Sequence, residues 1–502
     1  MYLALFSSLA YFIIMNFESY FQTFRNHIVG IDQIFESPHS MQKIVYADWT
    51  ASGRLYEPIE KKMLESFGPF VGNTHSESSI TGGLMTHAYH HAHEIIKKHV
   101  NANSDDVLLF VGAGMTAAIN KFQRILGVKI PEKFRDAISI PENDRPVVFV
   151  THMEHHSNQT TWYETIADVC VIEPTRNGLV DVESLRRSLG KYKDRSVKIG
   201  SFSACSNVTG IFSPYHQLAK IMHEHGGIAI IDFAASAPYV TMDMHPADPL
   251  EHLDAIIFSP HKFLGGPGTP GVLLFNKQHY TLQSPDQPGG GTVLWTNPWG
   301  QHKFSPDIEI REDGGTPGFL QAIKASLVVQ LKDHMGTENI TAREHELVTL
   351  LFQKMRTIPH LNILADNVEE RLCIFSFYFD NIHYNLVVKI LNDRFGIQAR
   401  GGCSCAGTYG HYLLHVDQQH SKSITDKIDA GDLSEKPGWV RISLHPTTTN
   451  NELNSIINAL EQIEKNIAEW KNDYAYDLHS NEYHHKQENG VMAKIAAQWF
   501  EV

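Results

Sequence analysis

Residues 255–275 read AIIFSPHKFLGGPGTPGVLLF. The first four, Ala255–Phe258, form an apolar run typical of a buried strand, and this run ends abruptly in Ser-Pro-His-Lys. Glycine and proline residues mark a turn before a second apolar run completes the stretch. Lys262 therefore follows closely on a strand whose residues are typical of a buried core, and the presence of a lysine there needs an explanation.

The flanking sequence repeats the same strand-and-turn pattern. From residue 44 to about residue 321, short apolar strands alternate with helical segments, as in VLLFVGAG followed by MTAAINKFQRIL. This alternation predicts an α/β domain with a large, mostly parallel sheet covered on both faces, and the pattern then changes to that of a smaller α+β domain. We expect a lead-in at 1–43, a large domain at 44–320, a small domain at 321–470 and a polar tail at 471–502.

Composition excludes several classes of protein. The 502 residues are 42% hydrophobic and 20% charged, as in a globular protein, and a net charge of −14 without a long basic run argues against a nucleic-acid partner. Five cysteines do not make a disulfide framework, which favours a reducing compartment such as the cytoplasm. The apolar residues 1–15 lack the preceding basic residues of a signal peptide and are short for a membrane span. For them we favour a packed helix or an early start codon over a membrane anchor.

Reactive side chains follow several of the predicted strands, at the sheet edge where such folds bind ligands. IAIIDF carries Asp232 at its end, and VFVTHMEHHSN places the ring of His155 at the same edge. FVGAG leads into a helix at Met115, whose amino terminus and Thr116 could hold a phosphate. Together these features predict a site for pyridoxal phosphate: a helix terminus for the phosphate, the flat ring of His155, a buried carboxylate and a lysine. In it Lys262 forms the Schiff base and Asp232 pairs with the pyridinium nitrogen.

These motifs resemble those of the class V aminotransferase family of fold-type I pyridoxal-phosphate enzymes, closest to the group II cysteine desulfurases and selenocysteine lyases. The resemblance covers roughly residues 46–460 through YADWTASGR, GAGMTAAIN, MEHHSN, SNVTG, IDFAASAP, FSPHKFLGGPGTPGVLL and EDGGTP. It implies the fold-type I transferase fold, a ring-stacking His155 and an Asn207 that faces cofactor and substrate. It also implies a homodimer in which Thr316 reaches the phosphate of the partner subunit's site. The implied phosphate ligands within the chain are Gly114, Met115, Thr116, Ser259 and His261.

Two motifs in the smaller domain bear on the substrate. VRISLHPTTTN resembles the segment whose arginine, here Arg441, grips the carboxylate of an amino acid through paired hydrogen bonds. ARGGCSCAG resembles the loop of the desulfurase cysteine and assigns that role to Cys405, with Cys403 as a second thiol. The resemblance thus implies conversion of L-cysteine to L-alanine and an enzyme persulfide, which a sulfur-acceptor protein could take. Arg400 and His75 are further candidates for substrate contact.

Some features depart from the family's pattern and leave alternatives open. Ala235 stands where the family has a glutamine on the cofactor's phenolic oxygen, and a polar insertion occupies residues 418–436. The family also contains aminotransferases, epimerases and β-lyases, which need no cysteine, and in such an enzyme Cys405 would be a bystander. A third alternative is a non-catalytic or metal-binding protein. His87 and His91 have the spacing of zinc ligands on a helix, but no glutamate follows His87, so we expect no metal site.

Overall fold

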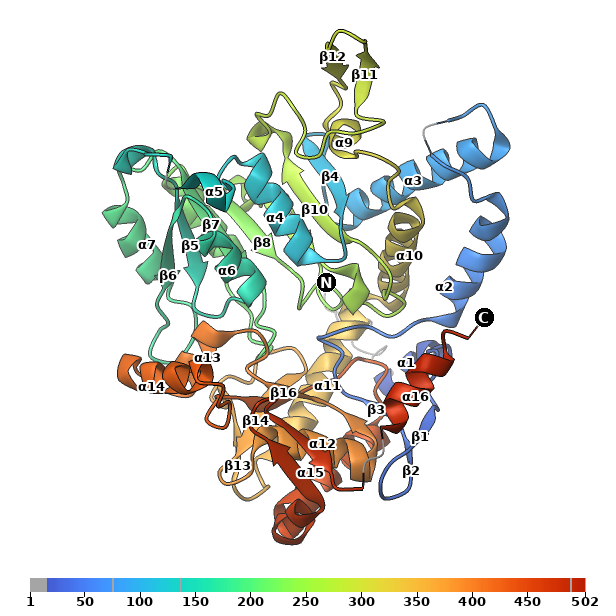
Figure 1. The fold of residues 1–502 in the computed structure, drawn as a ribbon, viewed down its shortest axis with the longest axis vertical. Coiled ribbons are helices and arrows are strands. Elements are labelled where there is room, and N and C mark those ends of the chain that lie inside the picture. Colours follow the sequence, from blue (N-terminus) through green and yellow to red (C-terminus); the bar gives the residue numbers. More distant parts are fainter. Residues whose placement is uncertain (1–15, 75, 136, 488–489, 502) are drawn as a thin grey trace, which may run out of the picture.

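A seven-stranded sheet forms the centre of the large domain in the computed structural model, which describes residues 16–74, 76–135, 137–487 and 490–501 (Figure 1). The strand order is β4-β10-β9-β8-β7-β5-β6, and only β10 runs antiparallel to its neighbours. The predicted α/β fold with a mostly parallel sheet is therefore confirmed. The strands are β4 Asp106–Val111, β5 Val147–Thr151, β6 Asp168–Ile172, β7 Lys198–Ser203, β8 Ile228–Asp232, β9 Ala255–Phe258 and β10 Gly271–Asn276.

Helices cover both faces of this sheet because its strands are apolar on both sides. α4 (Met115–Ile125) and α6 (His156–Tyr163) pack on one face. α7 (Val182–Lys191), α8 (Tyr215–Glu224) and α10 (Phe319–Met335) pack on the other. The remaining elements of this half are α2 Glu57–Lys62, α3 Ile80–His99, α5 Glu132–Arg135, α9 Ile308–Glu312 and the hairpin of β11 Val293–Thr296 and β12 His302–Phe304, which projects at the top of Figure 1.

The small domain is an antiparallel sheet with helices packed against it, as the change of pattern predicts. Its strand order is β13-β14-β17-β16. The chain passes into the small domain at Gly336, where a φ of +76° separates α10 from α11. The preceding helix, α10, still packs on the large domain, so the large domain extends beyond residue 320, where we expected it to end. Its elements are α11 Thr337–Met355, β13 Leu361–Ile363, β14 Ile374–Phe379, α12 Tyr384–Phe395, β15 Ile397–Gln398, β16 Arg400–Gly402, α13 Gly407–Leu413, α14 Gln418–Asp429, β17 Trp439–Ser443 and α15 Asn450–Trp470.

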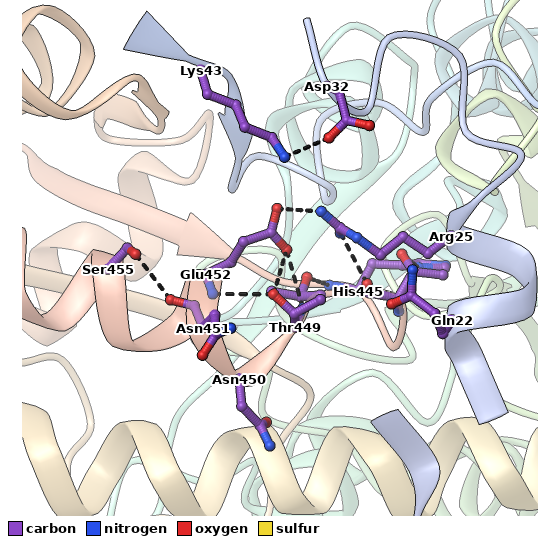
Figure 2. Close-up of polar contacts among 12 residues, drawn as sticks. Gln22, Arg25, Asp32, Lys43, His445, Thr449, Asn450, Asn451, Glu452 and Ser455 are labelled. Carbon is purple, nitrogen blue, oxygen red and sulfur yellow. Dashed lines mark hydrogen bonds and ion pairs between the residues drawn. The ribbon is translucent and has the colours of Figure 1, made fainter. Parts of the chain in front are cut away.

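The described part of the lead-in, from residue 16 onward, attaches to the small domain. Its elements are α1 Phe17–Arg25, β1 Ile34–Glu36, β2 Met41–Lys43 and β3 Val45–Tyr46. β3 pairs in parallel with β15, and Figure 2 shows Arg25 reaching the first turn of α15. There its guanidinium lies 2.6 Å from the Glu452 carboxylate and donates to the Thr447 carbonyl at 3.1 Å. These pairings join segments far apart in sequence, so local pattern does not reveal them.

The segment predicted as a polar tail also contains regular structure. β18 (Tyr474–Asp477) and β19 (Glu482–His485) form a hairpin that buries Tyr474, and α16 (Val491–Gln498) follows. Part of the predicted insertion forms α14, which lies largely exposed. Among the described residues, no helix has the length and apolar character to cross a membrane, and residues 1–15 lie outside them.

Candidate active site

A cavity of about 940 Å³ lies at the carboxyl ends of the parallel strands, where the large domain meets the small one. The large domain contributes Asp232, Lys262 and His155 to its wall, and the small domain contributes Arg441 and Cys405. Residues from five separate parts of the chain thus share one enclosure.

Asp232 and Lys262 end two neighbouring strands and face the same cavity. Asp232 is the last residue of β8, and Lys262 ends the short 3₁₀ helix Pro260–Lys262 that follows β9. Burial raises the pKa of Asp232 to about 7, although the Ala234 N–H, at 2.8 Å, and the charge of Lys262 oppose the shift. Burial lowers the pKa of Lys262 to about 8, against the attraction of Asp232. Near neutral pH the site therefore holds a lysine amine that gives up its proton readily.

The His155 ring is held neutral at the amino terminus of α6. It caps this helix by accepting the Ser157 N–H at 3.1 Å. Burial lowers its pKa to about 3, and the nearby charge of Lys262 adds to the shift. The preceding residue, Glu154, is fully buried and ties β5 to β7 by accepting hydrogen bonds from Thr151 and Ser203. This network fixes the backbone that presents the ring to the cavity.

The amino terminus of α4 forms a cradle with the loop after β9. The Met115 N–H donates to the Ser259 hydroxyl at 2.9 Å, and His261 Nδ1 lies 3.0 Å from the Ala113 carbonyl. A Cβ at Gly114 would lie 3.0 Å from the His261 ring, so glycine is needed for this close approach. The Thr116 and Ser157 hydroxyls lie 2.6 Å apart at the same end of the helix. Hydroxyl, imidazole and helix N–H groups at one helix terminus suit a phosphate group.

Two arginines and one aspartate form the wall on the side of the small domain. Arg400 and Arg441 are paired across β16 and β17, and both contact Asp48. Arg441 Nη2 lies 2.7 Å from the Asp48 carboxylate, while its Nε is buried without a hydrogen-bond partner in the described part of the chain. Arg441 itself lines the cavity, with its guanidinium held by Asp48 and by the Asn207 carbonyl. Asp48 lies within the segment YADWTASGR, and its position directly after a short apolar strand is the only local sign of a role.

The cysteine loop between β16 and α13 places its two thiols differently. Cys405 is exposed and lines the cavity, whereas Cys403 is half-buried and packs against the large hydrophobic core. Ser404 and Cys405 have φ values of +51° and +55°, a left-handed conformation that is uncommon outside glycine. The loop is held by the His156 N–H, which donates to the Cys405 carbonyl at 2.7 Å, and by Asn207 Nδ2, which donates to the Ser404 carbonyl at 2.8 Å.

The residues present fit pyridoxal phosphate. Asn207 Oδ1 is buried without a partner among the described residues, and the Lys262 amine likewise makes no hydrogen bond there. The cavity thus offers an unpaired amine, an unpaired amide oxygen, a buried carboxylate and a phosphate cradle. Ala235 lines the same cavity with a methyl group and offers no side-chain hydrogen bond.

Some predicted residues lie elsewhere. Thr316 is exposed on the loop after α9 and is not part of the cavity wall. His75 lies outside the described residues. His87 and His91 are exposed on α3, and His91 pairs with Glu94. Of the other cysteines, which lie in strand-like runs, Cys205 and Cys373 are buried and Cys170 is half-buried.

Comparison with known proteins identifies similar chains. The family model described as Aminotransferase class-V matches residues 45–456. A probable cysteine desulfurase from Halalkalibacterium halodurans is 26% identical over 72% of this chain and 84% of its own length. One from Staphylococcus aureus strain Mu50 is 24% identical over 87% of this chain and 96% of its own.

Solved structures give the same picture for the fold. The apo structure of a cysteine desulfurase from Thermococcus onnurineus NA1 superposes with a TM-score of 0.68 at 22% identity, covering 84% of this chain and 95% of that one. The cysteine desulfurase CsdA (S-sulfonic acid) from Escherichia coli gives a TM-score of 0.67 at 20% identity, covering 89% and 98%. The likeness shows that the chain shares their fold.

Proposed function

The chain belongs to the aminotransferase class-V family, and from this membership we propose that it is a pyridoxal-phosphate enzyme that removes sulfur from L-cysteine. The observation that carries the proposal is that Cys405 shares one cavity with Lys262 and Asp232. The names of the similar proteins point to the same reaction. The products would be L-alanine and a persulfide on Cys405.

The cofactor would be held by groups of the large domain. Ser259, His261 and the amino terminus of α4 would take its phosphate, and the neutral His155 would stack on its ring. Asp232 would face the ring nitrogen, and a cation there would favour the charged carboxylate that burial alone disfavours. Bound in this way, pyridoxal phosphate supplies an electron sink for the substrate's α-carbon.

The substrate carboxylate would meet Arg441 at the opposite wall. Its side chain is buried in the middle of β17 and lines the cavity, where it supplies positive charge for a carboxylate. Arg400, paired across the strand, adds positive charge at the same place. With the carboxylate fixed, the lowered pKa of Lys262, about 8, suits its amine to accept and return the α-proton.

Cys405 would take the sulfur. Its thiolate attacks the sulfur of the bound cysteine, so an S–S bond forms as the Cβ–S bond breaks, and the carbon product leaves as alanine after protonation. Arg400 and Arg441 line the same cavity as Cys405. The exposure of Cys405 would then let an acceptor protein reach the persulfide.

We also propose a homodimer and a cytoplasmic location. Thr316 is exposed and does not line its own cavity, which is consistent with a role in the partner subunit's site. The hairpin β11–β12 exposes Leu294, Trp295 and Trp299, and a subunit interface would cover such apolar area. All five cysteines are free, as expected in a reducing compartment. Light scattering of the purified protein tests the dimer.

The reaction is tested by measuring alanine and persulfide from L-cysteine with the cofactor-loaded protein. Cys405→Ser should lose persulfide and at least about 100-fold in alanine formation, as expected for loss of a nucleophile. The matched control Cys170→Ser changes a thiol in β6 and should retain activity. If alanine formation is unchanged in both the Cys405 and Cys403 variants, the protein catalyses another class V reaction, such as transamination, epimerisation or β-elimination.

Lys262→Ala tests the cofactor directly. This variant should lose the visible absorption of the covalently bound cofactor. Zinc in the purified protein together with an absence of pyridoxal phosphate would contradict the whole proposal and favour a metal-binding protein.

A further inference from the structure

The cysteine loop of the small domain is fastened to the large domain through His156. This residue begins α6, directly after His155, whose ring lines the cavity. The backbone N–H of His156 donates to the Cys405 carbonyl at 2.7 Å, and its ring Nε2 accepts the Gly407 N–H at 2.9 Å. One residue thus holds the loop at two points, immediately after the exposed thiol of Cys405.

The two hydrogen bonds lie on either side of a buried residue. Ala406, between Cys405 and Gly407, is fully buried and packs in the large hydrophobic core. The carbonyl before Ala406 and the N–H after it are the two groups that bind His156. Three consecutive residues are therefore fixed, and this leaves the loop little freedom to carry the Cys405 side chain elsewhere.

The loop needs this support because its backbone is strained. Ser404 and Cys405 both have left-handed φ values, which residues with a side chain keep where the surrounding structure holds them. Asn207 donates to the Ser404 carbonyl at 2.8 Å, and Trp439 Nε1 donates to the Ser404 hydroxyl at 3.2 Å. His156 supplies the corresponding contact for Cys405 itself.

The ring of His156 is suited to accept a hydrogen bond. Nε2 accepts the Gly407 N–H only while it carries a lone pair, so this contact assigns a neutral ring with its proton on Nδ1. Burial lowers the pKa of His156, which favours the same neutral form. A Cβ at Gly407 would lie 3.2 Å from Nε2, so a side chain there would crowd the contact.

From these contacts we propose that His156 is a positioning residue for sulfur transfer, which sets where the Cys405 thiol lies relative to the substrate sulfur. The inference rests on the proposed desulfurase reaction and adds the residue that joins the nucleophile to the cofactor side of the cavity. Reacting atoms must approach to about 3–3.5 Å, and a displacement of about 1 Å can cost about 100-fold in rate. Loss of the ring contact should therefore slow the transfer of sulfur more than the steps before it.

Two substitutions of similar size separate the hydrogen-bond acceptor from the bulk of the side chain. The amide oxygen of His156→Gln is as many bonds from Cα as Nε2 is, so it can accept the Gly407 N–H. His156→Met has a similar length and only a weak acceptor. In a single turnover of the cofactor-loaded protein with L-cysteine, persulfide formation should fall at least about tenfold in His156→Met. It should stay close to the wild-type rate in His156→Gln.

A second reaction of the same cavity detects a general structural defect. Exchange of the α-hydrogen of L-alanine with deuterium from the solvent depends on the cofactor, Lys262 and Arg441 in the proposed mechanism, but on no thiol. His156→Met should therefore keep the wild-type rate of exchange. His156→Asn, whose amide is one bond too short to reach Gly407, gives the same comparison if His156→Met folds poorly.

The outcomes distinguish this inference from the proposed reaction. Equal persulfide formation in His156→Met and His156→Gln would overturn the inference, and so would an equal loss of exchange and of persulfide formation in His156→Met. If Cys405→Ser loses the persulfide while His156→Met behaves as the wild type, the desulfurase proposal stands and the role of His156 is wrong. If Cys405→Ser leaves persulfide and alanine formation unchanged, both are wrong.

Discussion

Replacing Asp48 with asparagine should lower the stability of the protein and strengthen substrate binding. The Asp48 carboxylate contacts Arg441 at 2.7 Å and Arg400 at 3.1 Å. The Arg441 side chain is only 4% exposed, so this contact is a buried one, whereas Arg400 is 49% exposed and contributes little. A hydrogen bond between charged groups contributes about 1.5–3 kcal/mol, and asparagine keeps the acceptor oxygen but not the charge.

The stability effect follows from that contact. We expect the free energy of unfolding to fall by about 2 kcal/mol, which corresponds to a midpoint lower by about 4–8 °C for a domain of this size. Asp32→Asn is the control, because Asp32 pairs with Lys43 at the surface and is 79% exposed. Its midpoint should match that of the wild type. Thermal unfolding of the cofactor-loaded proteins measures both.

The binding effect has the opposite sign, since Asp48 competes with the substrate carboxylate for Arg441. Two negative groups about 5 Å apart repel by about 3 kcal/mol at an effective dielectric constant of 20, before screening. We expect the KM for L-cysteine to fall about tenfold, which is equivalent to about 1.4 kcal/mol. Alanine formation against cysteine concentration gives KM. A KM that rises, together with an unchanged midpoint, would refute this reasoning and make Asp48 a residue that positions Arg441.

Three further outcomes follow from the structure. The protein freed of cofactor should take up pyridoxal phosphate faster as pH rises and level off above about 8, because burial lowers the pKa of Lys262 to about 8 and the neutral amine is the reactive form. Stopped-flow absorbance measures this, and a rate independent of pH would contradict it. Arg25→Met should lower the unfolding midpoint, because it breaks the buried ion pair with Glu452 and so costs about 3 kcal/mol of unfolding free energy. Lys43→Met, which breaks the exposed ion pair with Asp32, should leave the midpoint unchanged. Limited proteolysis should then cut the lead-in first. Gly402→Ala should reduce alanine formation while the cofactor content stays unchanged. Any residue with a side chain is strained by about 1–3 kcal/mol at the Gly402 φ of +109°, so the loop that carries Cys405 must shift. Gly190→Ala, in α7 with free space around it, should leave activity intact.

Much of the fold and of the cofactor side of the cavity is predictable from the sequence. Continuous apolar strands alternate with helical segments along the chain, and this alternation predicts a parallel sheet. Because the carboxyl ends of parallel strands meet at one edge, the residues that end β8 and follow β9 were expected together, and Asp232 and Lys262 line one cavity. The start of α4 at Met115 is likewise a local feature of a glycine-rich turn.

The side of the cavity formed by the small domain required the structure. Asp48 and Arg441 are 393 residues apart, and nothing local indicates that they pair. The sequence CSC left two thiols open, and the left-handed conformations of Ser404 and Cys405 turn Cys405 toward the cavity and Cys403 toward the core.

The parallel sheet, and the lysine and aspartate at its ligand-binding edge, follow from local patterns in the amino-acid chain. The folded chain was needed to show that the lead-in joins the small domain, which arginines share Asp48 and which cysteine faces the cavity. The difference lies in the range of the interactions. Periodicity and turn chemistry act within a few residues and can be seen in the sequence, whereas pairing of buried charges depends on which distant segments are buried together.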